Sequence, residues 1–242
     1  MATFTDIQNR VKTRLIDLPA ATLAEVPSLV NQALRELQSR HNFWVMQKKL
    51  AANTAAITRT LATTPSDFKE FRLEPYYTEY TGYVVPMAVA KSSRELNGLF
   101  ETDDTGPPSY ILRSDPSDDL GASTLEVWPL SESQSDYTGA PAGEYRVTVP
   151  YWRYLPALSA GGDANWFTNN LIGELYLVNA ATALGFMINW DVSKETEWLS
   201  LADRQYELLI AEDKKLWLSG HDTFTPHQGA AWNKNTGSRK VG

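Results

Sequence analysis

The chain has 242 residues, of which 43% are hydrophobic and 21% charged, and these values are ordinary for a folded protein of one large or two small domains. A formal net charge of −7 and a pI near 5.0 argue against a body that grips nucleic-acid phosphates. The absence of cysteine from the sequence excludes disulfides and thiolate metal sites.

Neither a signal peptide nor a membrane span is expected. The N-terminus, Met1 to Asp6, lacks a basic region followed by an apolar block. The longest apolar run, residues 175–188, is interrupted by Asn179 and Thr182 and is too short to cross a bilayer. This run therefore predicts a buried helix.

Two helices are predicted at the N-terminus. A capping-box pattern at Thr5 to Gln8, with apolar residues at helical spacing after it, predicts a helix over about residues 5–17 that Pro19 stops. A second capping box at Thr22 to Glu25 predicts a helix that reaches about Arg40. The two helices form a hairpin whose apolar stripes must be buried elsewhere in the fold.

Short strands are predicted after this hairpin. From Phe43 to Pro150, apolar runs such as residues 83–85 and 88–90 alternate with Gly, Pro, Asn and Asp. Asn97-Gly98 is the dipeptide that a type I′ hairpin favours.

Two later strands are expected to pair with each other. They are Leu125–Trp128 and Tyr145–Val149, and the polar loop Ser131–Gly143 joins them. This part of the chain predicts an antiparallel β module.

Two long helices are predicted near the C-terminus. Residues 169–189 are apolar nearly all round, which indicates a central, buried helix. Asp191 or Ser193 can cap the next helix, and Gly220 is placed to end it. Its apolar stripe is expected to contain Trp198, Leu201, Ala202, Gln205, Tyr206, Leu209, Leu216 and Trp217. The opposite face is expected to contain Asp203, Arg204, Glu207, Glu212, Asp213 and Lys214.

The predicted fold class is α+β, with helices at both ends and the β module inserted between them. The N-terminal hairpin and the two C-terminal helices are expected to form one helical bundle, followed by an extended arm. The expected divisions are residues 1–45 and 151–220 for the bundle, 46–150 for the β module and 221–242 for the arm.

The arm is expected to bind a partner. Residues 221–242 are rich in Gly, Asn, Thr, Lys and Arg and have no periodic apolar positions, so they have little with which to fold alone. No acidic residue follows Asp222, so this end of the chain is positively charged. The segment either serves solubility alone or acts as a basic arm that docks on an acidic groove of a partner. An aromatic residue in such an arm is typical of an anchor for a partner's pocket. The predicted partner-binding residues are Phe224, Trp232, Lys234, Arg239 and Lys240.

No catalytic, cofactor or metal site is predicted. Phosphate-binding loops, dinucleotide fingerprints, the nucleophile elbow and the zincin motif are absent from the sequence. His41, His221 and His227 lie too far apart in the sequence to indicate a closed metal cluster. His221 and His227 could share a metal but are interpreted as solvated. The pairs Asp103-Asp104 and Asp118-Asp119 could serve as glycosidase carboxylates or a calcium site, but they lie among turn residues that aspartate commonly caps.

Eight tryptophans and eleven tyrosines leave a sugar-binding face open as an alternative. Packing in the core or against another subunit is the favoured interpretation for most of the tryptophans. These are Trp152, Trp166, Trp190, Trp198 and Trp217.

The order of the elements and motifs resembles the head-to-tail adaptor proteins of short-tailed and related tailed bacteriophages. Besides the N-terminal hairpin, the motifs are Thr64–Phe68, Gly106–Tyr110, Leu125–Pro129, Tyr151–Leu158 and Asn165-Trp166. The resemblance covers most of residues 4–218.

This resemblance implies a non-enzymatic virion protein at the capsid–tail junction, assembled in the host cytoplasm. It further implies a ring, typically of twelve copies, beneath the portal protein, with helices around a channel for genomic DNA and a surface for nozzle or other tail proteins. The alternatives are a carbohydrate-binding or glycan-cleaving module and a different connector or nozzle component of the same particle.

Overall fold

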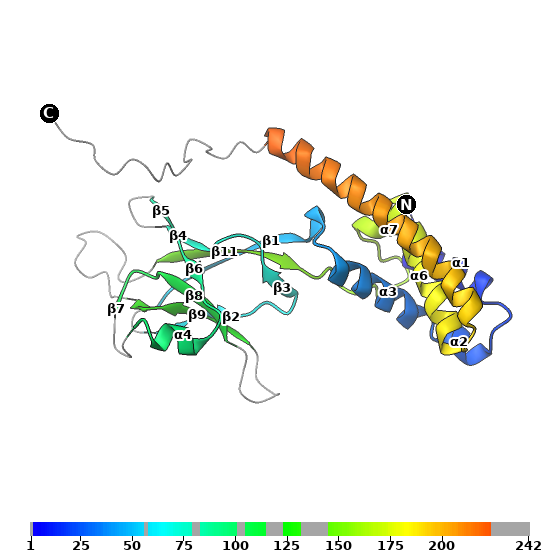
Figure 1. Cartoon of the computed structure of the whole chain (residues 1–242), viewed down its shortest axis with the longest axis horizontal. Coiled ribbons are helices and arrows are strands. Elements are labelled where there is room, and N and C mark those ends of the chain that lie inside the picture. Colours follow the sequence, from blue (N-terminus) through cyan, green and yellow to red (C-terminus); the bar gives the residue numbers. More distant parts are fainter. Residues whose placement is uncertain are drawn as a thin grey trace. The chain divides into compact units, whose positions relative to one another are not determined.

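A computed structural model of the chain describes residues 2–55, 58–78, 83–100, 105–114, 123–131 and 145–223, of which 105, 131 and 218–223 are described by backbone only. The chain forms two compact units (Figure 1). The helical unit comprises Met1–Trp44 and the chain from Leu158 onward, and the β unit is Val45–Ala157. The predicted α+β class is confirmed.

The described part of the helical unit is built from six helices. They are α1 (Phe4–Arg14), α2 (Ala20–Ala24), α3 (Val26–Arg40), α5 (Trp166–Asn169), α6 (Leu171–Ile188) and α7 (Val192–Thr223).

Helix α1 begins earlier than the sequence predicts, and its capping box lies at Thr3 rather than Thr5. The Thr3 hydroxyl accepts the Asp6 backbone N–H at 3.3 Å, and the Asp6 carboxylate accepts the Thr3 N–H at 2.9 Å. An ionised carboxylate is a stronger acceptor than the amide of Gln8, which explains why this pair forms the box. The hydrogen bond from the Thr3 backbone lowers the pKa of Asp6.

The predicted second helix is divided in two. Helix α2 ends at Ala24, and α3 begins at Val26 with Pro27 in its first turn. Proline lacks an N–H and clashes with the preceding turn, so a continuous helix through Pro27 is disfavoured. The apolar face of α3, from Val26 to Leu37, is buried as predicted.

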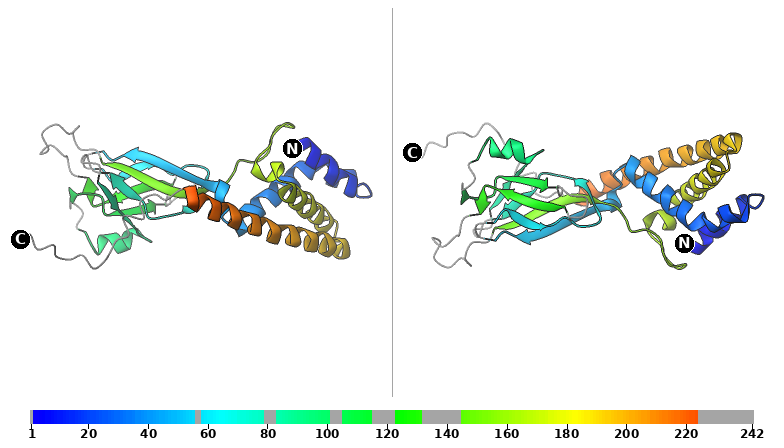
Figure 2. Two further views of the ribbon diagram at one scale, coloured as in Figure 1. Left: turned by 90° about the horizontal axis from the view of Figure 1, so that it is seen from above. Right: turned by 90° about the horizontal axis from the view of Figure 1, so that it is seen from below.

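Helix α6 is the centre of the helical unit. It contacts α1, α3, α5 and α7, and Figures 1 and 2 show it alongside α7. Asn170 caps it by accepting the N–H of Ile172 at 2.8 Å. Helix α6 is long and apolar enough to cross a membrane, but 72% of it is buried inside the protein. Its apolar surface therefore serves as a core, as the sequence predicts.

Helix α7 begins as predicted but ends later. The Asp191 carboxylate caps it by accepting the Lys194 N–H at 3.2 Å. The helix continues past Gly220 to Thr223, so the predicted stop at Gly220 is wrong. Glycine weakens a helix interior by about 1 kcal/mol but does not forbid it. Only residues beyond Thr223 can belong to the expected arm.

The described part of the β unit contains eleven short strands and one α-helix, α4 (Ser93–Asn97), and the 3-10 turn η1 (Trp44–Met46) leads into it. The strands are β1 (Gln47–Asn53), β2 (Thr60–Thr63), β3 (Phe68–Phe71), β4 (Tyr76–Thr78), β5 (Val84–Pro86), β6 (Ala88–Val89), β7 (Thr105–Gly106), β8 (Tyr110–Ser114), β9 (Thr124–Trp128), β10 (Leu130–Ser131) and β11 (Arg146–Arg153).

These strands form two main sheets. The first has the order β1-β11-β4-β5, with β3 also paired to β11, and the second has the order β2-β9-β8-β6. Strand β11 pairs with β1 over its whole length, from Gln47 opposite Trp152 to Asn53 opposite Arg146. Most pairs are antiparallel, but β6 with β8 and β7 with β10 are parallel. The expectation of a purely antiparallel module is thus corrected to a mixed one.

Two local predictions in this unit are wrong. The strands at Leu125–Trp128 and Tyr145–Val149 lie in different sheets, because β9 pairs with β2 and β8 while β11 pairs with β1, β3 and β4. Asn97-Gly98 closes helix α4 instead of a hairpin, and Gly98 has a φ of −85°. Ser92 accepts the Glu95 N–H at 3.3 Å, so this helix-start pattern decides the local structure. Residues 132–143 of the predicted loop lie outside the described residues.

The larger core of the β unit lies on the inner faces of its strands. Its buried members are Leu61, Tyr77, Met87, Ile111, Leu125, Val127, Tyr145, Val147 and Val149. A smaller cluster contains Ala90, Leu96, Leu112 and Trp128.

Candidate interaction surfaces

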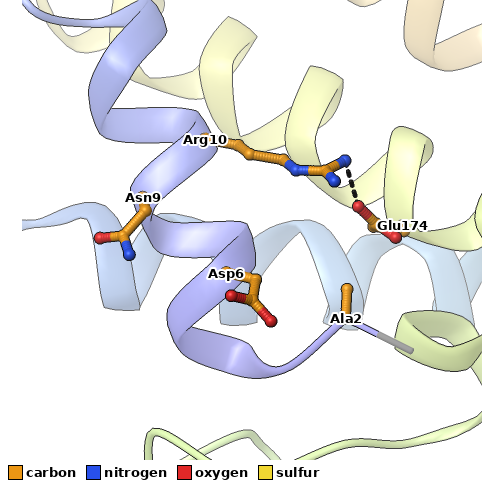
Figure 3. A pocket seen from close by; sticks show the side chains of 5 residues that line it. All are labelled: Ala2, Asp6, Asn9, Arg10 and Glu174. Atoms are coloured by element: carbon orange, nitrogen blue, oxygen red, sulfur yellow. Dashed lines mark ion pairs between the residues drawn. The ribbon is translucent and has the colours of Figure 1, made fainter.

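A polar hollow of about 360 Å³ lies beside α1 and α6. Figure 3 shows Arg10 of α1 reaching across to Glu174 of α6, with which it forms an ion pair. Ala2, Asp6 and Asn9 complete the lining. The Glu174 side chain is 9% exposed and that of Arg10 is 54% exposed, so the pair joins a buried carboxylate to the surface. The sequence analysis did not single out either residue.

Asp213 of α7 is the centre of a second polar cluster. Its carboxylate accepts the backbone N–H of Trp44 at 2.7 Å and the indole Nε1–H of Trp217 at 3.2 Å. Its Oδ2 lies 3.0 Å from Nε2 of His41. The Asp213 side chain is 1% exposed, so these contacts replace its hydration.

The sequence analysis placed Asp213 on the polar face of α7, and the structure corrects this. Position 213 follows Leu209 by four residues and Ala202 by eleven, and both of these are buried. Helical spacing therefore places Asp213 on the inward stripe. His41 is a partner of this carboxylate.

The helical unit also holds the residue at which the chain returns from the β unit. Leu158 donates its N–H to Oδ1 of Asn31 at 2.8 Å, and its carbonyl accepts from Nδ2 of the same side chain at 2.9 Å. Asn31 lies on α3. With Trp44 held by Asp213, both chain crossings are fixed to the helical unit by a side chain.

Arginines cover two aromatic residues of α7. The Arg14 guanidinium lies 4.4 Å from the ring centroid of Trp198 and donates to the amide of Asn179 at 2.6 Å. The Arg40 guanidinium lies 4.1 Å from the ring of Tyr206. These contacts confirm the expected inward positions of Trp198 and Tyr206.

An exposed apolar surface lies at the turn between α6 and α7. Met187 and Ile188 are 44% and 47% exposed, and Trp190 is 88% exposed. Trp190 is also a described non-glycine residue with positive φ, 59°. Among the predicted packing tryptophans, Trp152 is buried, whereas Trp190 is not covered by any of the residues that the structure describes.

The turn around Trp190 is a Schellman motif. Trp190 donates its N–H to the carbonyl of Met187, and Asp191 donates to the carbonyl of Phe186, both at 3.1 Å. Trp190 thus occupies the left-handed position at which glycine is usual. Neither the backbone preference of tryptophan nor packing against the described residues explains a tryptophan at this position. Exposed aromatic residues of this kind are typical of interface anchors.

Aromatic residues of the β unit lie mostly in its interior. Trp128, Tyr151, Tyr77, Tyr145 and Trp152 are each no more than 8% exposed. These rings therefore do not form a sugar-binding platform. The described residues of this unit still expose apolar side chains, which are Leu73, Tyr83, Val84, Val89 and Leu99.

In the β unit, Asp67 binds one side chain from β1 and one from β11. Its carboxylate accepts from Nζ of Lys48 at 2.7 Å and from the hydroxyl of Tyr151 at 3.0 Å, and its carbonyl accepts the Tyr154 N–H at 2.7 Å. Burial alone would raise the pKa of Asp67, but the bonds from Lys48 and Tyr151 hold this pKa below its ordinary value.

Several predicted positions cannot be placed. The arm residues Phe224, Trp232, Lys234, Arg239 and Lys240, the aspartate pairs at 103–104 and 118–119, and His227 lie outside the described residues. Within the described ranges, no group of three or more His, Asp or Glu side chains could hold a metal ion.

The two-unit α+β fold exposes apolar side chains, which are candidates for contacts with other molecules. Residues 2–222 match the sequence profile of the family described as SU10 adaptor protein. The chain therefore belongs to this family of phage head-to-tail adaptors. The comparison with curated proteins found no match.

Proposed function

We propose that this protein forms a ring of twelve copies that docks beneath the phage portal protein and provides the attachment platform for nozzle or other tail proteins. The family match over residues 2–222 carries this proposal, because an adaptor is by definition a junction between head and tail. The site of action is the capsid–tail junction of the virion, and the ring assembles in the bacterial host's cytoplasm.

Each part of the chain has a proposed task. The helices predicted over residues 1–45 and 151–220, which lie in the unit of residues 1–44 and 158 onward, act as a bundle and as the scaffold of the ring. The β module predicted over residues 46–150, which extends over residues 45–157, presents surface to neighbours or tail proteins. The arm, which is the part of the predicted segment 221–242 beyond Thr223, docks on the portal, with Phe224 and Trp232 as anchors and Lys234, Arg239 and Lys240 as steering charges.

The net charge suits a protein around a DNA channel. Each copy has a formal charge of −7, and a ring multiplies this charge around the lumen. An acidic wall repels phosphates, whereas a basic wall would retain them. Genomic DNA is therefore expected to pass without sequence-specific or lasting contact.

Particles that lack this gene product provide the direct test. We expect DNA-filled heads that lose their genome and carry no tails, as seen by electron microscopy of the purified particles. Tailed, infectious particles in the absence of the protein would contradict the proposal. The order in which proteins join the head distinguishes an adaptor, which joins at the portal, from a more distal nozzle component.

The arm has its own test. A chain that ends at Thr223 keeps the whole of α7, because the helix ends at that residue. We expect this truncation to lower affinity for purified portal protein, while a Lys234→Ala/Arg239→Ala/Lys240→Ala chain should lose mainly association rate and salt dependence. Unchanged portal affinity of the truncated chain would contradict a docking arm.

We further propose that the protein is no enzyme, since its family is a structural one. The glycan-binding alternative has no support from the aromatic residues buried in the β unit. Saccharide binding by a stable monomer, measured on a glycan array, would favour that alternative.

A further inference from the structure

The exposed half of α7 has an unusual arrangement of side chains. Val192 and Leu199 are 64% and 45% exposed, and Leu201 and Leu208 are 37% and 45% exposed. Single exposed apolar residues are normal on protein surfaces. Here, however, each pair has a spacing of seven residues, which places its two members on the same side of a helix.

The two pairs lie on opposite sides of α7. Val192 and Leu201 are nine positions apart, as are Leu199 and Leu208, and nine residues correspond to about 180° around a helix axis. We call Val192 with Leu199 the first flank and Leu201 with Leu208 the second flank.

The inward and outward faces of α7 separate these flanks. Ala202, Leu209 and Asp213 mark the inward face, which packs in the helical unit. The outward face is exposed and polar, with charges of both signs, and contains Ser193, Glu197, Ser200, Arg204 and Glu207. A helix that faced water over its whole outer half would have no reason to place leucines on both edges of that half.

We propose that the second flank of α7 packs against the first flank of α7 in the neighbouring copy of this chain. This inference rests on the proposed ring and names its contact within the helical unit. A closed cyclic array needs two different faces on each subunit, and these flanks provide them on one helix. The polar outward face between them stays in contact with water.

The heights of the flanks fit copies that stand side by side. Leu199 and Leu201 differ by about 3 Å along the helix axis, because each residue rises about 1.5 Å. In neighbours whose α7 helices run parallel to the ring axis, Leu201 of one copy therefore meets Leu199 of the next at nearly the same level. A disulfide introduced across this contact can therefore test it.

The sequence has no cysteine, so a disulfide can be introduced without background. The variant is Leu199→Cys/Leu201→Cys in the full chain. Residues two apart on a helix do not face each other, so the new thiols cannot readily pair within one copy. We expect mild oxidation to give a ladder of covalent oligomers on a non-reducing gel, because each copy can bond to two neighbours.

Matched variants identify the contact. Each single-cysteine variant should give no species above a dimer, and Ser193→Cys/Ser200→Cys on the outward face should give no ladder. A ladder from the outward-face pair equal to that from Leu199→Cys/Leu201→Cys would overturn the inference.

A charge exchange gives an independent test. Leu201→Glu/Leu208→Glu and Val192→Lys/Leu199→Lys should each raise the protein concentration needed for assembly at least about tenfold, measured by light scattering after size-exclusion chromatography. The chain with all four substitutions should recover assembly, since its acidic flank then meets its neighbour's basic flank. Far-UV circular dichroism would check that each variant is folded.

The outcomes distinguish this inference from the proposed function. The wild type could form oligomers while Leu199→Cys/Leu201→Cys gives no disulfide ladder and neither charged pair changes the concentration needed for assembly. That result would overturn the α7 contact and leave the proposed ring intact. A wild-type chain that stays monomeric at every concentration, together with a Leu199→Cys/Leu201→Cys variant that gives no ladder, would contradict the ring itself.

Discussion

The backbone N–H of Trp44 donates to the buried carboxylate of Asp213 at 2.7 Å, so a side chain late in the sequence holds the residue at which the chain leaves the helical unit. The same carboxylate also binds His41 and Trp217. A single buried side chain thus satisfies groups from three places in the sequence.

Replacing Asp213 should destabilise the helical unit strongly. Asp213→Ala removes the acceptor of the part-buried N–H groups of Trp44 and Trp217, at an expected cost of about 1–3 kcal/mol. Asp213→Asn keeps one acceptor oxygen and should cost less. Urea unfolding followed by the helical circular dichroism signal measures both, with the exposed Glu207→Ala as control. A loss below about 1 kcal/mol for Asp213→Ala would contradict this role.

Trp190→Gly should be more stable than Trp190→Ala. Trp190 has a φ of 59°, and side chains with a Cβ cost about 1–2 kcal/mol in this left-handed region. Alanine keeps the Cβ, so the comparison isolates the backbone strain from loss of the indole. Thermal unfolding of the two variants provides the measurement. Equal stabilities would show that the turn carries no such strain.

Gly173→Ala should destabilise the protein although alanine is the better helix former. A Cβ at Gly173 would lie 2.4 Å from the backbone carbonyl oxygen of Phe167, which cannot move without shifting α5. We expect a net loss of about 1–3 kcal/mol from this overpacking. Gly162→Ala is the matched control, because a Cβ there meets nothing within 4 Å. Chemical unfolding of both variants tests the difference.

The β unit should lose part of its stability in acid through Asp67. The folded-state pKa of this carboxyl is lowered, so its stabilising effect is present above the unfolded-state pKa of about 4 and is lost as pH falls through the folded-state pKa. The pair with Lys48 is partly exposed, so the effect should stay below about 1 kcal/mol.

The hydrogen-exchange rates of the β1 and β11 backbone amides, measured at several pH values, test this effect. Asp67→Asn should exchange faster than the wild type near neutral pH, and the two should converge in strong acid. A constant difference at every pH would show that the charge of Asp67 contributes nothing.

The sequence alone determined those features that depend on local periodicity. The burial of α6 follows from apolar residues on all its sides, and Asp191 was identified as a possible cap of α7 because the residue can accept N–H groups of the first turn. The order of motifs also identified the adaptor family, which the match over residues 2–222 confirms.

Only the tertiary structure decided the features that depend on partners distant in sequence. Leu125–Trp128 and Tyr145–Val149 both have strand patterns, but a strand's pattern does not name its neighbour, and the two entered different sheets. From the sequence alone, Asp213 is expected on the exposed face of α7. The fold brings His41 and Trp44 into contact with its carboxylate. Local periodicity fixes which residues form a helix or strand, whereas long-range hydrogen bonds and packing determine which of those elements meet.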